Sequence, residues 1–235
     1  MRKWPTVRVG DVCTQIRGVS YPKEEATSVP SAACIPLLRA GNITDFGLSL
    51  EDLVYVPYAR VRAEQHLQRG DILIATSSGS IDVIGKSAQV RDDYIATFGA
   101  FCKVIRPGPR IDSQYAGHYF RTDAYRQRVS TLAAGANINN LRNQDLDNLD
   151  IPLPPLDEQR RIAGILDHAD LLHSKRRHAL ARLAGLTQSA FVEILGDPST
   201  NQMRWPVVDI GSMLVSADYG TSEKAAQAGT YPVCA

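Results

Sequence analysis

The feature that most constrains the fold is a cluster of prolines directly before the longest helix-forming stretch of the chain. The run IPLPPLDEQRRIAGILD occupies residues 151–167 and places three prolines within its first five positions. Proline has no backbone N–H, so it can neither continue a helix nor donate to a sheet ladder. We therefore expect a domain of residues 1–150 to end here, with the prolines fixing the direction of the next element.

A single long helix is predicted to follow, from Asp157, a good helix cap, to Leu195. No proline interrupts this stretch, and only Gly164 and Gly185 separate strong helix formers. Its 39 residues would extend about 58 Å at ~1.5 Å each, more than a domain of this size needs as cover. The junction and helix, residues 151–198, should therefore project. The alternative is a core helix that folds back on its own domain.

Apolar residues along this helix recur at spacings of three and four, which is typical of a helix that pairs with another in a coiled coil. The seam consists of Ile162, Ile165, Ala169, Leu172, Ala179, Leu183, Leu186 and Ala190, and Arg176 is the exception within it. A second helix should pack there. The predicted pairing residues are Ile162, Ile165, Ala169, Leu172, Leu183 and Leu186.

Residues 1–150 mix short strand-like runs with many turn signals, which predicts an irregular α/β (α+β) domain. The strand-like runs are 54–56, 72–75, 81–84 and 98–105, and one helical region runs from about 113 to 133. Asp112 and Asp123 could each cap a helix start there. The aromatic residues of this region are expected in the core.

The opening of the chain recurs after the long helix. The motif W-P-x-V-x-V-G at residues 4–10 returns as W-P-x-V-x-I-G at residues 205–211, an offset of 201 residues. Such a period is too long for a solenoid and matches a tandem of whole modules. We therefore interpret residues 199–235 as the start of a second module. It is too short for a core of its own, so residues 205–235 should form at most two short strands.

Composition excludes several classes of protein. No stretch approaches the roughly 18 apolar residues of a membrane span and the amino terminus lacks a signal peptide's apolar core, so a cytoplasmic protein without membrane contact is expected. The four cysteines form no C-x-x-C pair and are expected as reduced thiols. The formal net charge of +1 argues against nucleic-acid binding by bulk electrostatics, so any such partner must be met locally.

No catalytic, cofactor or metal site is predicted. The sequence GSIDVIGKS at residues 79–87 imitates a phosphate-binding loop, but Ser80 stands where that motif needs its first glycine. A strand-turn-strand hairpin is the better interpretation. His168, His173 and His178 recur every five residues, which turns them to different sides of a helix and excludes a shared metal ion.

Several segments together resemble a known family, the specificity (S) subunits of type I restriction-modification systems. The most specific are the proline junction and the link FVEILGDP that is followed by WP. GNI at 41–43, GDILIATSSGS at 70–80 and GANINNL at 135–141 also fit. The resemblance covers nearly the whole chain, although most of the family's second recognition domain and its second helix are missing.

The resemblance implies that residues 1–150 are a target recognition domain that reads half of a bipartite site in double-stranded DNA. The long helix would act as a spacer that sets the gap between the halves. Modification (methyltransferase) and restriction subunits would be the partners that carry out the chemistry, so the chain itself is not expected to be an enzyme. Two copies that pair through the helix would form a homodimer. The rival hypothesis is a regulatory or assembly module that makes no contact with DNA.

Candidate DNA contacts follow from residue type and loop position. Arg and Asn can form two hydrogen bonds with one base edge, and the candidates of this kind are Arg39, Asn42, Asn137, Asn139, Asn140 and Arg142. The turn of the predicted hairpin offers further groups for phosphates or base edges, namely Thr76, Ser77, Ser78, Ser80 and Lys86. The alternatives are that Asn137 and Asn140 bond to their own backbone, and that the turn is simply solvated.

Overall fold

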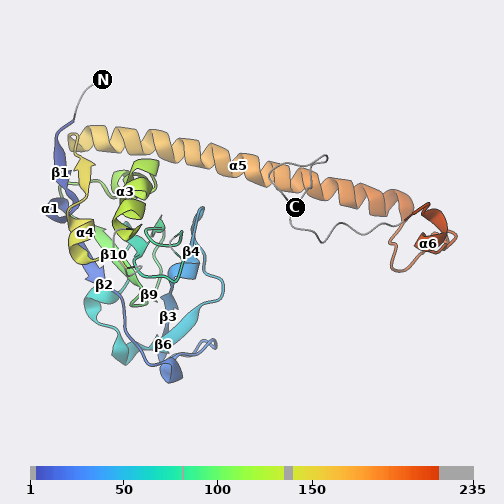
Figure 1. Ribbon diagram of the computed structural model, residues 1–235, viewed down its shortest axis with the longest axis horizontal. Helices are drawn as coiled ribbons and strands as arrows, with labels where there is room; N and C mark the ends of the chain where they lie inside the picture. The colour runs from blue at the N-terminus through green and yellow to red at the C-terminus, as the bar shows by residue number, and fades with distance from the viewer. Residues whose placement is uncertain (1–3, 81, 135–139, 217–235) are drawn as a thin grey trace, which may run out of the picture. The chain divides into compact units, whose positions relative to one another are not determined.

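The computed structural model describes residues 4–80, 82–134 and 140–216, and the chain divides into two compact units, Met1–Ser174 and Lys175–Ala235. A four-stranded sheet lies at the centre of the first unit (Figure 1). Each strand pairs antiparallel with its neighbour. The strands lie in the order β2 (Cys13–Arg17), β10 (Cys102–Pro107), β7 (Ile72–Ala75) and β8 (Ser87–Gln89).

The two faces of this sheet bury two separate clusters of side chains, because side chains alternate between the faces along a strand. In β7, Ile72 and Ile74 belong to one cluster, whereas Leu73 and Ala75 belong to the other. All four residues of β7 are buried. The sheet is therefore the middle layer of the domain.

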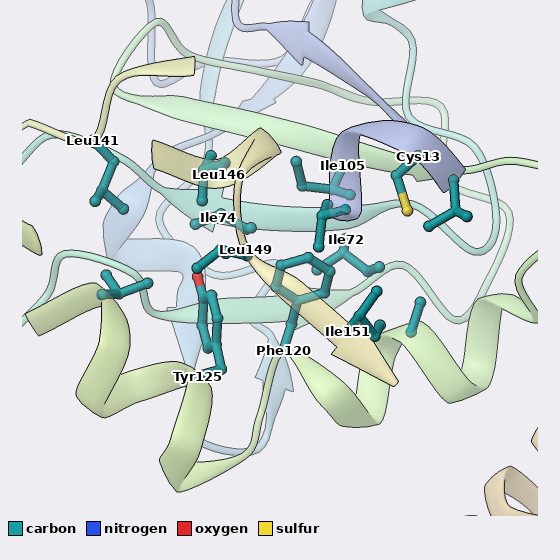
Figure 2. Close-up of a cluster of buried hydrophobic side chains, with 14 of the residues drawn as sticks. Cys13, Ile72, Ile74, Ile105, Phe120, Tyr125, Leu141, Leu146, Leu149 and Ile151 are labelled. Atoms are coloured by element: carbon teal, nitrogen blue, oxygen red, sulfur yellow. The ribbon is translucent and has the colours of Figure 1, made fainter. Parts of the chain in front are cut away.

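Helices cover the first face of the sheet. The rings of Phe120 and Tyr125 extend from the helical layer toward Ile72, Ile74 and Ile105 of the sheet, as Figure 2 shows. These two rings pack edge to face with their centroids 5.0 Å apart. The layer is formed by α2 (Ser113–Tyr119), α3 (Asp123–Ala134), α4 (Asn143–Asp147) and the strand β11 (Asp150–Pro152).

The predicted helical region contains two helices, because capping side chains start a helix twice. Asp112 caps α2 as predicted, since its carboxylate accepts a hydrogen bond from Tyr115 N at 3.0 Å. The cap of α3 is Thr122, whose Oγ1 accepts from Tyr125 N at 3.2 Å, and Asp123 is the first helical residue instead. The expectation that the aromatic residues enter the core is confirmed.

A smaller three-stranded sheet covers the opposite face. Its central strand β3 (Cys34–Leu38) pairs antiparallel with β6 (Val54–Pro57) and parallel with β9 (Thr97–Phe98). This part of the domain also contains a hairpin and four single turns of 3-10 helix: β4 (Ile43–Thr44), β5 (Gly47–Leu48), η1 (Lys23–Glu25), η2 (Ala40–Asn42), η3 (Tyr58–Arg60) and η4 (Ala63–Gln65). The α/β character predicted for the domain is confirmed.

The predicted hairpin exists as β7 and β8, but the strand expected at residues 81–84 is wrong for the described residues 82–84, which lie in a turn. Gly85 explains the turn. Its φ is +75°, and a Cβ placed on it would lie 2.4 Å from the Cγ1 of Val129 in α3. Only glycine combines this backbone conformation with so close an approach.

The start and the end of the domain lie side by side. β1 (Thr6–Arg8) pairs antiparallel with β11, and α1 (Val9–Val12) follows it. Val9 N donates to the carbonyl of Leu149 at 2.8 Å, and Leu153 N donates to the carbonyl of Pro5 at 2.7 Å. The first strand is thereby tied to the proline junction, directly before the long helix.

The predicted long helix is confirmed as α5 (Leu156–Leu195), 40 residues that would measure roughly 60 Å. It begins one residue earlier than expected, so Asp157 lies within the first turn and is not the cap. Only Gln159 and Ala163 of the helix are buried, which excludes a core helix. The first compact unit includes α5 as far as Ser174, and the rest of the helix belongs to the second unit.

The repeat has a structural counterpart in the second unit. α6 (Ile210–Met213) stands 201 residues after α1, so both copies of the motif form a single helical turn at the same place. Val9 and Val12 of the first copy are in the core, whereas Ile210 and Met213 are each 71% exposed. No strand occurs in residues 205–216, the described part of the second copy. The same motif therefore lies against a core in the first copy and is exposed in the second.

Two expectations from composition can be compared with the structure. Cys13, Cys34 and Cys102 are free thiols, and burial raises the pKa of Cys13 and of Cys102 to about 12. Cys234 lies outside the described residues. Within the described ranges, none of the helices has both the length and the hydropathy that crossing a membrane requires.

Candidate nucleic-acid interface

Three loops that are distant in sequence meet at one end of the four-stranded sheet. β7 ends where β10 begins, because Ala75 pairs with Cys102 in the antiparallel register. The loop after β7 is held by the loop before β10, since Thr76 N and Ser77 N both donate to the carbonyl of Phe101, at 2.9 and 3.1 Å. Residues 140–142 form the third loop. We call this meeting point the loop junction.

The third loop is attached to the first by backbone contacts. Ser77 and Asn140 form an isolated antiparallel bridge, and Leu141 N donates to the carbonyl of Thr76 at 2.8 Å. The polar segment TSSGS and the last two residues of GANINNL, Asn140 and Leu141, therefore lie next to each other in the fold. Sequence reasoning selected both segments, but it gave no indication that they are neighbours.

Lys103 in β10 holds the third loop of the loop junction through a hydrogen bond, and sequence reasoning missed this residue. Its side chain is buried, and its ammonium group donates to the carbonyl of Leu141 at 2.8 Å. Burial and the nearby Arg17 lower the pKa of Lys103, and the carboxylates of Asp145 and Asp147 oppose this shift. A lysine inside a strand gives no signal in the sequence that it will hold a distant loop.

The serine-rich turn offers hydroxyl groups at the loop junction. Ser77 and Ser78 are half-buried and Ser80 is exposed, with Ser80 N donating to the hydroxyl of Ser78 at 3.2 Å. Thr76 differs, because it is 1% exposed and its hydroxyl donates to the carbonyl of Phe101. Thr76 therefore holds the loop in place. Its buried hydroxyl is not available for the contact with phosphates or base edges that the sequence suggested.

Asn140 and Arg142 are exposed on either side of Leu141. The Arg142 guanidinium lies against the Asp145 carboxylate, with nitrogen to oxygen distances of 3.1 and 3.2 Å. Exposed pairs of this kind contribute at most about 1 kcal/mol. A phosphate or a guanine edge can therefore compete for this arginine.

Two of the other candidates lie in the η2 segment, away from the loop junction in the chain. Asn42 is 4% exposed, and its amide accepts from Arg39 N at 2.9 Å and donates to the carbonyls of Ser49 and Glu51. Asn42 is therefore a structural residue, which corrects its selection as a DNA contact. Arg39 is exposed and donates to the carbonyl of Asp52 at 3.0 Å.

The remaining candidates are less informative. Lys86 is half-buried at the far end of the β7–β8 turn and lies 3.5 Å from a carboxylate oxygen of Asp45. Asn137 and Asn139 lie outside the described residues. Phe101 itself, which no sequence pattern selected, is 70% exposed at the loop junction.

The predicted seam of α5 is an exposed apolar stripe. Ile162 is half-buried at the border of the domain, and the other five predicted pairing residues are exposed: Ile165, Ala169, Leu172, Leu183 and Leu186. The buried residues Gln159 and Ala163 lie on the opposite side of the helix, since 100° separates successive residues. The seam residues of the first unit, Ile165, Ala169 and Leu172, are thus directed away from the domain.

One group of side chains has the composition of a metal site. His118, Asp167 and Asp170 offer ligand atoms within 4.8 Å of one another. Both carboxylates are paired with arginines, however, namely Arg91 and Arg121. Positive charge already fills the place of a cation, so this group is an ion-pair cluster.

Comparison with known proteins gives consistent results. Residues 1–182 match the family described as type I restriction modification DNA specificity domain. The chain is 34% identical over 232 residues to the type I restriction enzyme StySPI specificity subunit of Salmonella potsdam, which covers 94% of this chain and 50% of that protein. It is 44% identical over 164 residues to the EcoKI specificity subunit of Escherichia coli (strain K12), which covers 70% of this chain and 35% of that protein.

A solved structure shows the same fold. The HsdS subunit from Thermoanaerobacter tengcongensis aligns with a TM-score of 0.59 and 23% identity, over 80% of this chain and 44% of that chain. The chain spans half or less of the length of these relatives. Because the family match extends from residue 1 through the recognition domain and into α5, the chain belongs to the type I restriction-modification DNA specificity family.

Proposed function

We propose that this chain is the DNA-recognition component of a type I restriction-modification complex. Its first domain reads one half of a bipartite site in double-stranded DNA, in the cytoplasm. Methyltransferase and restriction subunits, the class of partner implied by the family, carry out the chemistry. The chain itself is a binding component and not an enzyme.

The observation that carries this proposal is the loop junction. It places hydroxyl, amide and guanidinium groups from Ser77, Asn140 and Arg142 at one end of a sheet whose backbone is fixed by hydrogen bonds. Such groups are the ones that contact base edges and phosphates in protein–DNA complexes. A rigid support suits base reading, because each contact must be held in register with one base pair.

The proposed interface consists of the exposed and half-buried members of the predicted set. Ser77, Ser78, Ser80, Asn140 and Arg142 form its centre, and Asn137 and Asn139 are proposed to extend it. Lys86 and Arg39 are proposed as peripheral phosphate contacts. Asn42 and Thr76 are left out, because their side chains are buried and used within the domain.

We further propose that the exposed seam of α5 packs against another helix. Ile165 is 57% exposed and Leu172 is 52% exposed, and burying each such side chain stabilises an interface by roughly 1 kcal/mol or more. We propose a second copy of the chain as the source of that helix. A two-fold pair of recognition domains would read inverted copies of one half-site, so the recognised sequence should be a gapped palindrome.

Sequencing of DNA methylation tests the proposal. The chain is expressed with its modification subunit in a host that has no methylation of its own, and the methylated motif is determined. We expect one bipartite motif that disappears without the chain. An assembly module that does not read DNA would leave the motif unchanged when Asn140 and Arg142 are replaced by alanine, and that result would refute the proposal.

A further inference from the structure

α5 is attached to the recognition domain at two separate places. The first attachment is the start of the helix, where Gln159 and Ala163 are buried. The side-chain oxygen Oε1 of Gln159 accepts from Asp112 N at 2.8 Å, and its side-chain nitrogen Nε2 donates to the backbone carbonyl of Pro154 at 2.8 Å. This attachment joins the helix to the cap of α2 and to the proline junction.

The second attachment is ionic and lies two to three turns further along the helix. Asp167 lies 3.3 Å from an Arg91 nitrogen and 3.0 Å from His118 Nε2. Asp170 lies 3.4 Å from Arg91 and also pairs with Arg121. The hydrogen bonds from Arg121 hold the pKa of Asp170 below its usual value, so this carboxylate is charged. We call this group the ionic joint.

The partners in the ionic joint come from two different parts of the domain. Arg91 lies between β8 and β9, whereas His118 is in α2 and Arg121 follows it. Neither carboxylate needs these partners to keep α5 helical, because the partners lie at least 49 residues away in the chain. The role of the ionic joint is therefore to hold the helix against the domain.

Two attachments determine a direction, whereas one attachment permits a swing. Gln159 and Asp170 are 11 residues apart, which is about 16 Å along a helix. Without the ionic joint, the domain could rotate about the first attachment. A domain of this size has a radius of gyration of roughly 15 Å, so we take the distance from the first attachment to the loop junction as about 20 Å. A rotation of about 10° would then move the loop junction by ~3.5 Å, close to the rise of one base pair.

We infer that Arg91, Arg121, Asp167 and Asp170 are positioning residues that fix the gap length of the recognised DNA site. They act by setting the angle between the recognition domain and its spacer helix. None of them belongs to the proposed DNA interface, so they control spacing and not base identity. This inference rests on the proposed function for its consequence in DNA, although the joint itself can be measured without DNA.

The test variant is Asp167→Asn/Asp170→Asn, which removes both charges and conserves side-chain shape. Its matched control is Asp157→Asn/Glu193→Gln, which removes two exposed carboxylates of the same helix outside the joint. The angle between the domain and the helix is followed by double electron–electron resonance, which measures the distance between two nitroxides on the complete chain. Nitroxides are attached through encoded azide residues at exposed Arg69 in the domain and exposed His173 in the helix. We expect a narrow distance distribution in the wild type and control, and a clearly broader one in the test variant.

The gap is then read from methylated genomic DNA for the same three proteins with their modification subunit. Each exposed ion pair changes the equilibrium between the held and the released helix by a factor of about 1.5–5, and several pairs are lost together. The methylated fraction of sites whose gap is one base pair too long or too short should therefore rise roughly five- to tenfold. The half-site bases should stay the same. The wild type and control should keep one gap length.

The outcomes separate the inference from the proposed function. An unchanged distance distribution in the test variant refutes the ionic joint as a positioning device, whatever the DNA result. A broader distribution with a single unchanged gap refutes its control of spacing. A wild type that yields no bipartite motif refutes the proposed function and with it the role in spacing, while the distance measurement still decides whether the joint fixes the angle.

Discussion

Replacing Gln159 with glutamate should destabilise the recognition domain in a way that depends on pH. Gln159 is 1% exposed at the first attachment of α5. A glutamate can still accept the hydrogen bond from Asp112 N. Its ionised carboxylate cannot donate to the carbonyls of Pro154 and Arg110, which the glutamine amide meets at 2.8 and 3.3 Å. The substitution therefore turns two favourable contacts into contacts between a charge and two carbonyl oxygens.

The size of the effect follows from burial. Protonated, the new side chain can keep one of the two donor contacts, so its cost is one hydrogen bond, about 1 kcal/mol. Ionised, it is buried without a positive partner, and a rise of its pKa by ~2 from the reference of about 4.3 adds ~2.7 kcal/mol. Because the folded pKa lies above the unfolded one, the stability of the protonated form is fully present below pH ~4.3 and is lost as the pH rises through the raised value.

The assay is urea unfolding of the variant and the wild type at pH 5 and at pH 7.5. We expect the variant to lose about 3–4 kcal/mol of unfolding free energy at pH 7.5 and about 1–2 kcal/mol less than that at pH 5. Gln188→Glu is the control, because Gln188 is exposed on the same helix and should show no such difference. An equal loss at both pH values would show that residue 159 is not buried against these carbonyls.

Further predictions concern the turn, the seam and the interface. Gly85→Ala should lower the free energy of unfolding, measured by chemical denaturation, by about 2–4 kcal/mol, because a methyl group would face α3 from a left-handed backbone. A loss below ~1 kcal/mol would contradict the packing there. Leu172→Asp should abolish self-association in sedimentation, whereas Leu171→Asp, equally exposed but outside the seam, should not; equal effects would refute the seam. Arg142→Ala should relax methylation at one base position, by roughly 1–3 kcal/mol of discrimination, whereas Lys86→Ala should weaken all sites alike and lower the salt dependence of binding; the reverse pattern would exchange their roles.

Some features of this protein follow from local sequence alone. The proline junction predicts the start of α5 to within one residue, because proline restricts the backbone without help from distant residues. The repeat predicts that residues 205–211 copy the opening of the chain, and both copies form a single helical turn, which the sequence pattern did not predict. Local patterns were less reliable where a neighbour decides the outcome. Gly85 makes a turn of residues expected as a strand, because α3 leaves no room for a side chain there.

The candidate site depends on contacts that no local pattern contains. Ser77 and Asn140 are 63 residues apart in the chain and become neighbours only through the strand order of the central sheet. That order also brings Lys103 beneath Leu141, and the same tertiary packing determines which candidates are buried, as with Asn42. Amino-acid periodicity and proline geometry act over a few residues and so predict the long helix and the end of the domain, whereas the family was suggested by the resemblance of whole motifs. The pairing of distant strands and the ionic joint depend on the folded chain, because their free energy exists only when those segments meet.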